Sequence, residues 1–359
     1  MRRFTVSLLG LSPLIVATTL AAQNARGVTQ TGSVAPAPRD PVTKRAMTVA
    51  DYARWRTIAS VAISDDGAWA TYSYQQRWVD DTLYLKSFGL DAEQKIPRAG
   101  RAQFSDDSKW VAYFVVEPVK PNDRSGADEP RNGPARLELR NLATGTTTGW
   151  DNVGSFAFSR GSSALIVRKA RAGAAPDAAP AGRGGRGAAA GAPAARVDGT
   201  DLILRHLHDG IDELIGSVNA AEFSKDGKLM AYTVSAAGRD GNGLFVESTM
   251  NWQRRALDNS RADYTRLTWN DSGTAVAALR GMDRRGFTER ENALIAFVDV
   301  GEAQPKSFVL DRKALTGLPD SMVLSDKGTL SWSADRSKVF VGLKPQEAQA
   351  TRRDSTAIV

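Results

Sequence analysis

Six hairpin-like segments repeat along the chain, each with apolar residues at alternate positions on both sides of a polar turn. An apolar anchor residue precedes Ser or Asn, a turn with Asp or Gly follows, and a second alternating stretch begins after it. Period-two alternation is typical of β-strands, and Asp and Gly favour tight turns between them. The pattern therefore predicts six β-hairpins. Their anchor residues are Ile63, Phe104, Phe158, Phe223, Trp269 and Trp332.

Additional apolar stretches lie between these hairpins and predict a second pair of strands in each repeat. Anchor spacings of 41 to 65 residues fit units of four short strands, and one such sheet cannot bury both faces unless its neighbours stack on it. The predicted fold is therefore all-β: a β-propeller of four-stranded blades at residues 48–344, with five clear blades and a sixth that begins near residue 323. The additional strands are predicted at residues 82–88, 136–142, 201–207, 243–249 and 293–300.

The N-terminal residues 1–23 have the three-part pattern of a secretory signal peptide. Arg2 and Arg3 precede an apolar stretch, and small residues follow it. A membrane anchor is the alternative, but the apolar stretch is shorter than the ~20 residues of a spanning helix and Pro13 interrupts it. We therefore expect an exported protein, periplasmic or extracellular, with no membrane span after signal cleavage.

Four other segments lack the strand pattern. Residues 24–47 predict a flexible N-terminus, and residues 345–359 a polar tail. Residues 170–196 contain 22 Ala, Gly and Pro among 27 residues, which predicts a disordered insert in the third blade. Between the N-terminus and the first hairpin, Thr48 could cap a short helix at residues 49–57, with Tyr52 and Trp55 on one face, packed on the propeller as a lid. Residues 117–135 form a second polar insert.

Composition and charge exclude several kinds of site. The chain has no Cys and two His, so thiolate sites, disulfides and a three-His zinc site are excluded. The net charge of +7 is carried entirely by residues 1–23, 24–46 and 170–199, outside the predicted blades. A single Arg183-Gly-Gly-Arg186-Gly sequence is too little for an RNA-binding tract. We therefore expect no nucleic-acid partner.

The two histidines are the first candidates for chemistry. His206 and His208 stand two residues apart at the end of a predicted strand, with Asp209 next to them. Alternate residues share one strand face, and two imidazoles with a carboxylate can ligate a metal ion. Leu202 and Leu204 occupy the same face, however, which favours a strand end emerging into solvent or a histidine held by local hydrogen bonds. No metal or cofactor is therefore expected.

Paired acidic and basic residues are the other candidates. Two of the three Asp-Asp pairs fall on predicted turns, where Asp bonds the backbone, and none has the staggered spacing of a calcium loop. The basic clusters at Arg254-Arg255 and at residues 280–285 are most simply solvated loop charge. The eight Trp are expected mainly in core packing. The sequence thus marks no catalytic, cofactor-binding or metal-binding residue.

The hairpin motif Phe/Trp-Ser-x-Asp-Gly resembles the propeller repeats of the Tol translocation protein and of prolyl oligopeptidase-type serine peptidases. The opening Asp51-Tyr-x-x-Trp55, followed by Ile63-Ser-Asp-Asp-Gly67, is similar to the start of secreted bacterial members of that peptidase family. This resemblance implies an N-terminal propeller of seven or eight blades before an α/β-hydrolase domain. The hydrolase carries its nucleophile in a Gly-x-Ser-x-Gly motif, followed by Asp and His.

That motif is absent from this sequence, as is any alternating strand–helix region. We therefore expect a chain that stops before the propeller closes, so that it is aggregation-prone or partly folded because a sheet edge is exposed. The resemblance implies a non-catalytic propeller that restricts access of peptide substrates to a C-terminal hydrolase domain. The alternatives are a free-standing periplasmic propeller that binds a protein or glycan, and a hydrolase or lyase acting through the propeller channel.

Overall fold

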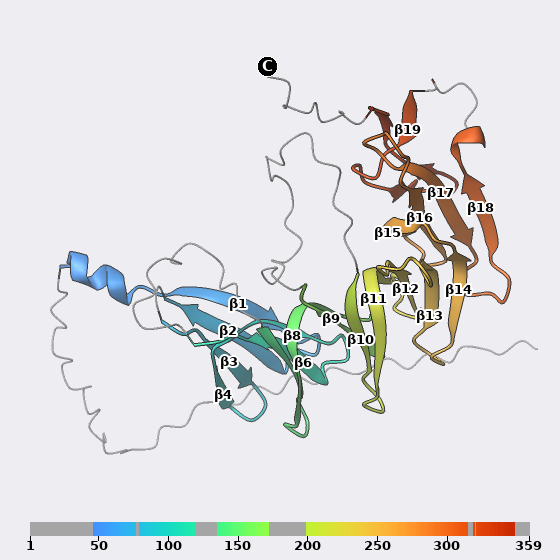
Figure 1. Ribbon diagram of the computed structural model, residues 1–359. Helices are drawn as coiled ribbons and strands as arrows, with labels where there is room; N and C mark the ends of the chain where they lie inside the picture. The colour runs from blue at the N-terminus through green and yellow to red at the C-terminus, as the bar shows by residue number, and fades with distance from the viewer. Residues whose placement is uncertain are drawn as a thin grey trace, which may run out of the picture. The chain divides into compact units, whose positions relative to one another are not determined.

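The alternating stretches of the sequence fold as antiparallel hairpins joined in series (Figure 1). The computed structural model describes residues 46–76, 79–118, 135–171, 199–314, 319 and 321–348. Blade 1 consists of β1 (Thr57–Ile63), β2 (Trp69–Gln75), β3 (Thr82–Ser87) and β4 (Ala92–Pro97). Blade 5 has the same order in β15 (Asp263–Trp269), β16 (Ala275–Met282), β17 (Glu291–Val298) and β18 (Lys306–Leu310).

Blades 2 to 4 share two long strands and therefore form one ten-stranded sheet. Blade 2 contains β5 (Ala99–Phe104), β6 (Trp110–Val115), β7 (Ala135–Asn141) and the first half of β8 (Thr147–Phe158). Blade 3 contains the second half of β8, β9 (Ala164–Lys169), β10 (Thr200–His206) and the first half of β11 (Asp212–Phe223). Blade 4 contains the rest of β11, β12 (Leu229–Val234), β13 (Gly243–Ser248) and β14 (Arg254–Asn259). The predicted all-β fold of four-stranded blades is confirmed.

A bulge interrupts the first strand of every one of these five blades. In β8 the register shifts between Val153 and Ser155, and in β11 between Val218 and Ala220. A non-glycine residue with positive φ lies in or next to each bulge and re-aims the strand. In the long strands β8 and β11, the bulge separates the half that closes one blade from the half that opens the next. These residues are Ser60, Arg101, Asn152, Ser217 and Arg266.

The core lies in the seams between successive blades. Leu83 and Leu85 on β3 pack against Val111 and Tyr113 of blade 2, all nearly inaccessible to solvent. Each later blade repeats this contact, because its third strand presents aliphatic residues at alternate positions. Full burial of one such side chain stabilises the fold by about 1.5–3 kcal/mol. The corresponding third-strand pairs are Leu137 and Leu139, Leu202 and Leu204, and Leu244 and Val246.

The N-terminal end of the series of blades differs from the prediction in detail. A 3-10 helix, η1 (Val49–Arg54), replaces the predicted helix at 49–57, because β1 already begins at Thr57. Tyr52 and Trp55 contact each other, with ring centroids 4.6 Å apart, but both are more than half exposed, so they do not form a packed lid.

The sixth repeat begins near residue 323 as predicted, with β19 (Met322–Leu324) after the 3-10 helix η2 (Arg312–Ala314). It is formed by two short ribbons. One pairs β19 with β22 (Leu343–Pro345), and the other pairs β20 (Ser331–Trp332) with β21 (Val339–Phe340). The predicted tail boundary is therefore wrong at Pro345, which belongs to a strand.

Several predicted segments lie outside the described residues. They are the signal peptide at 1–23, nearly all of the flexible N-terminus at 24–47, most of the inserts at 117–135 and 170–196, and the end of the tail at 345–359. Among the helices that are described, none has the length and apolar character needed to cross a membrane.

Candidate functional site

The first hairpin turn of blades 1 to 4 is built around a buried serine hydroxyl, and that of blade 5 around the buried side chain of Asn270. In blade 1, Ser64 Oγ accepts a hydrogen bond from the backbone N–H of Trp69 (2.9 Å) and donates one to Asp66 Oδ1 (2.6 Å). Asp66 in turn accepts the N–H of Ala68 (2.9 Å). The Ser-x-Asp motif thus satisfies its own backbone, as predicted for the Asp pairs on turns. The same pairing occurs in Ser105 with Asp107, Ser224 with Asp226, and Ser333 with Asp335.

These turns also bind one another across the seams. The N–H of Asp66 donates to Ser108 Oγ of the next blade (3.1 Å), and the N–H of Asp107 donates to Ser162 Oγ of the one after it (3.0 Å). Asp106 Oδ2 accepts the N–H of Gly161 (3.1 Å). Successive turns are therefore held as a row by contacts that join residues 42 and 55 positions apart.

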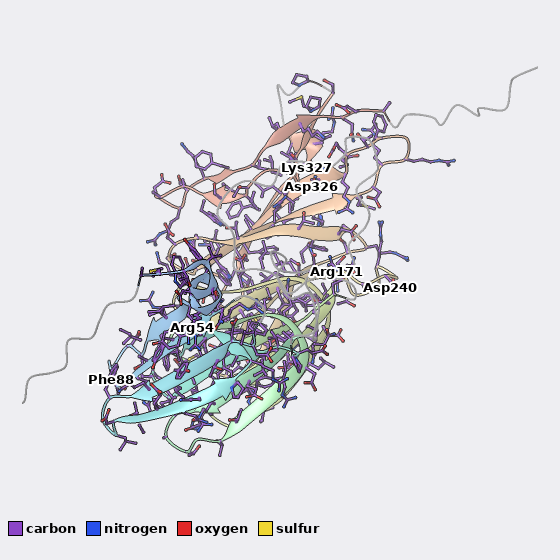
Figure 2. All side chains as sticks on the ribbon, turned by 90° about the vertical axis from the view of Figure 1, so that its left-hand side faces the viewer. Arg54, Phe88, Arg171, Asp240, Asp326 and Lys327 are labelled. Atoms are coloured by element: carbon purple, nitrogen blue, oxygen red, sulfur yellow. The ribbon has the colours of Figure 1, made fainter. Side chains whose placement is uncertain are left out.

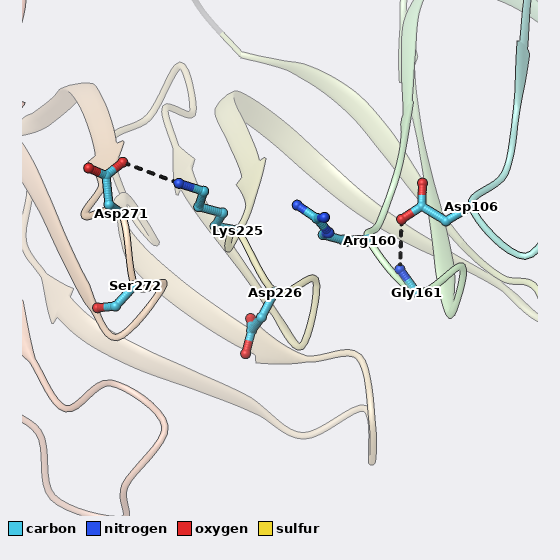
Figure 3. A pocket seen from close by; sticks show the side chains of 7 residues that line it. All are labelled: Asp106, Arg160, Gly161, Lys225, Asp226, Asp271 and Ser272. Carbon is cyan, nitrogen blue, oxygen red and sulfur yellow. Dashed lines mark hydrogen bonds and ion pairs between the residues drawn. The ribbon is translucent and has the colours of Figure 1, made fainter. Parts of the chain in front are cut away.

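The turns of blades 2 to 5 line a shallow hollow of about 560 Å³ (Figure 3). Its charged groups alternate in sign, and Lys225 Nζ lies 3.7 Å from Asp271 Oδ1. The Arg160 side chain lies between the turns of Asp106 and Lys225 in Figure 3. We take this open hollow as the candidate site. Its lining consists of Asp106, Arg160, Gly161, Lys225, Asp226, Asp271 and Ser272.

The chemistry of this lining suits binding better than proton transfer. Partial burial on its own would raise the pKa of Asp226, but hydrogen bonds from the Ser224 hydroxyl and the Lys228 N–H outweigh it and lower the pKa below its usual value. Asp226 is therefore ionised at neutral pH and is no general acid. Among the described residues, no three His, Cys, Asp or Glu side chains are grouped to hold a metal ion.

The two histidines are not brought together. His206 is buried and its ring stacks on Trp252 of blade 4, with centroids 3.3 Å apart, whereas His208 is exposed in the following turn. Neither ring nitrogen of His206 has a hydrogen-bond partner, although Nδ1 lies 3.6 Å from Asp209 Oδ1. The expectation of a histidine held by local hydrogen bonds is therefore wrong, because stacking in the seam between blades 3 and 4 holds the ring.

Arg254 and Arg255 are not solvated loop charge either, whereas Arg284 and Arg285 of the second basic cluster are exposed in a loop, as predicted. The Arg254 guanidinium joins two blades: it donates to Glu247 Oε2 on β13 (3.2 Å) and to Glu213 on β11. Arg255 donates to the Val300 carbonyl of blade 5 (2.6 Å). Glu247 is fully buried, and its Oε1 has no hydrogen-bond partner. The sequence prediction was wrong here because the acceptors lie far away along the chain.

A second polar network joins blades 4 and 5 and was also missed. Asp263, at the start of β15, is buried and receives ion pairs from Arg239 (3.6 Å) and Arg290 (3.5 Å). Both arginines also pair with Asp283, at 2.5 Å and 3.0 Å. Nothing in the spacing of these four residues marks them in the sequence. The network fills a seam, so we assign it to blade packing and not to a site.

No family model matches the chain, and no curated protein matches it. Solved structures that match include TolB from Acinetobacter baumannii, which is 13% identical, with 70% of this chain and 56% of that chain covered and a TM-score of 0.30. The β-propeller domain of the Trilobed protease from Pyrococcus furiosus is 10% identical, with 83% and 86% covered and a TM-score of 0.36.

A third matching structure is the acylaminoacyl peptidase of Pyrococcus horikoshii, which is 10% identical, with 76% of this chain and 41% of that chain covered and a TM-score of 0.35. The chain thus spans little more than half the length of TolB and less than half that of the acylaminoacyl peptidase.

Proposed function

We propose that this chain is the non-catalytic propeller region of an exported prolyl oligopeptidase-like serine peptidase. The observation that carries the proposal is the Ser-x-Asp hairpin repeat together with the Asp51–Gly67 opening, folded as successive four-stranded blades. The peptidase chemistry would reside in an α/β-hydrolase partner domain with its own Ser, Asp and His. The apolar 1–23 segment supports export, and peptides are the expected substrates.

The role of the blades in this proposal is steric. The row of turns is tied together through Ser108 and Ser162, so this face is stiff and cannot open widely without losing hydrogen bonds. Each such bond contributes about 0.5–1.5 kcal/mol. A stiff face of this kind would admit short peptides and exclude folded proteins from a hydrolase domain.

The test starts with the reading frame at the native locus, followed by expression of the complete encoded protein. We expect a downstream Gly-x-Ser-x-Gly motif whose Ser is labelled by a fluorophosphonate probe. The complete protein should cleave short Xaa-Pro peptides but not folded proteins. The control is the same protein with that Ser changed to Ala. A frame that ends at Val359, with no probe labelling of the purified chain, overturns the proposal.

The alternative is a free-standing, Tol-like propeller that binds a protein or glycan. The hollow supports a protein partner, because three carboxylates and two cationic side chains at its rim offer paired charges of both signs. Reversal of Lys225 to Glu would weaken such a partner's binding and leave any peptidase activity of the complete protein unchanged. Peptidase activity and partner binding can therefore be told apart.

A further inference from the structure

The tips of the first hairpin turns carry charged groups in a fixed order along the row of blades. The tip is the residue directly after the buried Ser or Asn, and it is exposed in each of blades 1 to 5. Blades 1 and 2 present carboxylates, blades 3 and 4 present cations, and blade 5 presents a carboxylate again. A basic centre is thus flanked by acidic groups on both sides. The five tips are Asp65, Asp106, Arg160, Lys225 and Asp271.

All of these tips lie at the same end of the strands, because each connects the first strand of its blade to the second. The loops between the second and third strands lie at the other end, where Figure 2 labels Arg171 in the β9–β10 loop and Asp240 in the β12–β13 loop. The tips of blades 2 to 5 line the hollow. A molecule in the hollow therefore meets side chains from four blades at once, a set that no single hairpin provides.

The turns beneath these tips hold them in place. Two hydrogen bonds join the turns of blades 2 and 3. The turns of blades 3 and 4 lie in direct contact, because a Cβ at Gly227 would lie 2.0 Å from the Arg160 carbonyl oxygen. The turns of blades 4 and 5 are also close, since a Cβ at Gly273 would lie 3.0 Å from Ser224 Cβ. The backbone under the charged groups is thus already ordered, which reduces the entropy that binding would cost.

The two cations at the centre can bind an external group. The Arg160 guanidinium is exposed and has no ion pair or hydrogen bond with any other described residue. Lys225 is 60% exposed, and its 3.7 Å pair with the exposed Asp271 is of a kind that contributes little to stability, so a ligand can replace it. A guanidinium binds a carboxylate through two parallel hydrogen bonds. A carboxylate is therefore the ligand group that suits the centre of the hollow.

The carboxylates around this centre exclude several classes of ligand. Together with Asp226, the lining has three carboxylates and two cations, which gives a net charge of −1. A polyanion would meet Asp106 and Asp271 on either side of the centre, and a purely basic peptide would meet Arg160 and Lys225. A carboxylate between two cationic groups avoids both repulsions. An extended polypeptide with basic, acidic and basic residues at alternate positions has this pattern on one face.

We propose that the hollow binds an extended polypeptide segment whose central carboxylate lies between Arg160 and Lys225. The basic side chains on either side of that carboxylate pair with Asp106 and Asp271. This inference rests on the alternative function above, in which the propeller binds a protein, and it names the chemistry of the bound segment. Because the hollow is open to solvent, the ion pairs stay partly hydrated, so binding is weak, salt-dependent and selective for the order of charges.

Fluorescence anisotropy of a peptide that carries a neutral dye tests the site, with the protein expressed from the complete reading frame. The peptide contains Lys-Thr-Glu-Thr-Lys and has blocked ends, and mass spectrometry checks that it stays intact. We expect a dissociation constant on the order of 100 μM at low salt, rising about tenfold in 0.5 M NaCl. The same peptide with Gln in place of Glu should bind about fivefold more weakly, because it lacks the carboxylate for the basic centre.

Arg160→Gln should weaken binding of the Glu peptide about tenfold, because the free guanidinium is removed. The matched control is Lys109→Gln in the blade 2 turn. It also removes one positive charge, from a side chain that is 72% exposed and lies outside the hollow, and it should leave the dissociation constant unchanged. Both positions are exposed, so neither substitution should unfold the protein, and an unchanged urea midpoint checks this.

A charge reversal tests the order of charges directly. Arg160→Glu should lose binding of the Lys-Thr-Glu-Thr-Lys peptide and bind Lys-Thr-Lys-Thr-Lys instead, because the centre of the hollow then presents a carboxylate. No binding of the Glu peptide at 1 mM overturns the proposal, as does equal binding of the Glu and Gln peptides or insensitivity to Arg160→Gln.

Displacement of the peptide by 10 mM inorganic phosphate, but not by sodium chloride of the same ionic strength, would indicate a general anion site and also overturns the proposal. The peptidase proposal is tested separately, because fluorophosphonate labelling depends on the Ser of the hydrolase domain and not on the hollow. Failure of one proposal therefore leaves the other open to its own measurement.

Discussion

In the first hairpin of each of blades 1 to 5, the residue three positions after the buried Ser or Asn has a positive φ. The blades accommodate this backbone conformation in two ways. The residue is Gly67, Gly227 or Gly273 in three blades but Ser108 or Ser162 in two. Positive φ is unfavourable for Ser by about 1–2 kcal/mol. Each Ser compensates with a hydrogen bond to the N–H of the preceding turn. A serine side chain would not fit at Gly227, because the backbone of Arg160 lies too close.

Gly227 and Gly67 should therefore respond differently to alanine. A Cβ at Gly227 would lie 2.0 Å from the Arg160 carbonyl oxygen, whereas a Cβ at Gly67 would meet nothing within 4 Å. The two residues have φ of 74° and 69°, so backbone strain is the same in both. We expect Gly67→Ala to cost about 1 kcal/mol and Gly227→Ala about 2–4 kcal/mol of unfolding free energy, measured in urea. Equal losses would mean that the turns of blades 3 and 4 are not in contact.

The seam between blades 3 and 4 joins strands through charge as well as apolar packing. The pKa of Glu247 is raised to about 7, mainly by burial and also by the neighbouring Glu213 carboxyl. Arg254 acts in the opposite direction. One guanidinium serves two carboxylates, so the ionised triad carries an uncompensated negative charge in a buried place. The strands β11, β13 and β14 are therefore held together best when Glu247 retains its proton.

This arrangement predicts a stability that falls as pH rises. A pKa raised above the unfolded value contributes stability that is complete below about pH 4.5 and is lost as pH passes through about 7. Between pH 5 and pH 8 we expect a loss on the order of 2 kcal/mol in urea unfolding. Glu247→Gln should remove this dependence and be the more stable form at pH 8.

The matched control for that series is Glu302→Gln, at an exposed position in the β17–β18 turn. It should keep the dependence of the native chain on pH. If Glu247→Gln retains the full loss between pH 5 and pH 8, another group is responsible and the buried triad is not the sensor.

Local stability should differ from blade to blade along the chain, because most contacts join strands of the same blade or of adjacent blades. Blade 3 is paired on both sides within the ten-stranded sheet, whereas β20 and β21 form an isolated two-residue ribbon. We expect amide hydrogens at Val339 to exchange rapidly by local opening, and those at Val167 to exchange only with unfolding of the blade. Hydrogen exchange with residue resolution measures this, and uniform protection would contradict it.

The sequence by itself determined the hairpins, their anchors and the four-stranded blades, because hydrophobic alternation and turn chemistry are local features. In blade 1, the anchor Ile63, the turn serine Ser64 and the turn glycine Gly67 lie within five residues of one another. Even the third strands were found, since each carries its own alternate leucines, such as Leu137 and Leu139. The short helix at 49–57 and the Pro345 boundary failed because pairing with β2 and β19, and not local propensity, sets where β1 and β22 lie.

Only the tertiary structure decided which residues meet across the seams. Ser108 reaches Asp66, Arg254 reaches Glu213, and His206 stacks on Trp252, over separations of 41 to 46 residues. Such partners depend on how blades stack and on the bulges that aim each first strand. A side chain's partner in a neighbouring blade leaves no periodic trace in the sequence, which is why the hollow and the buried triad emerge only from the fold.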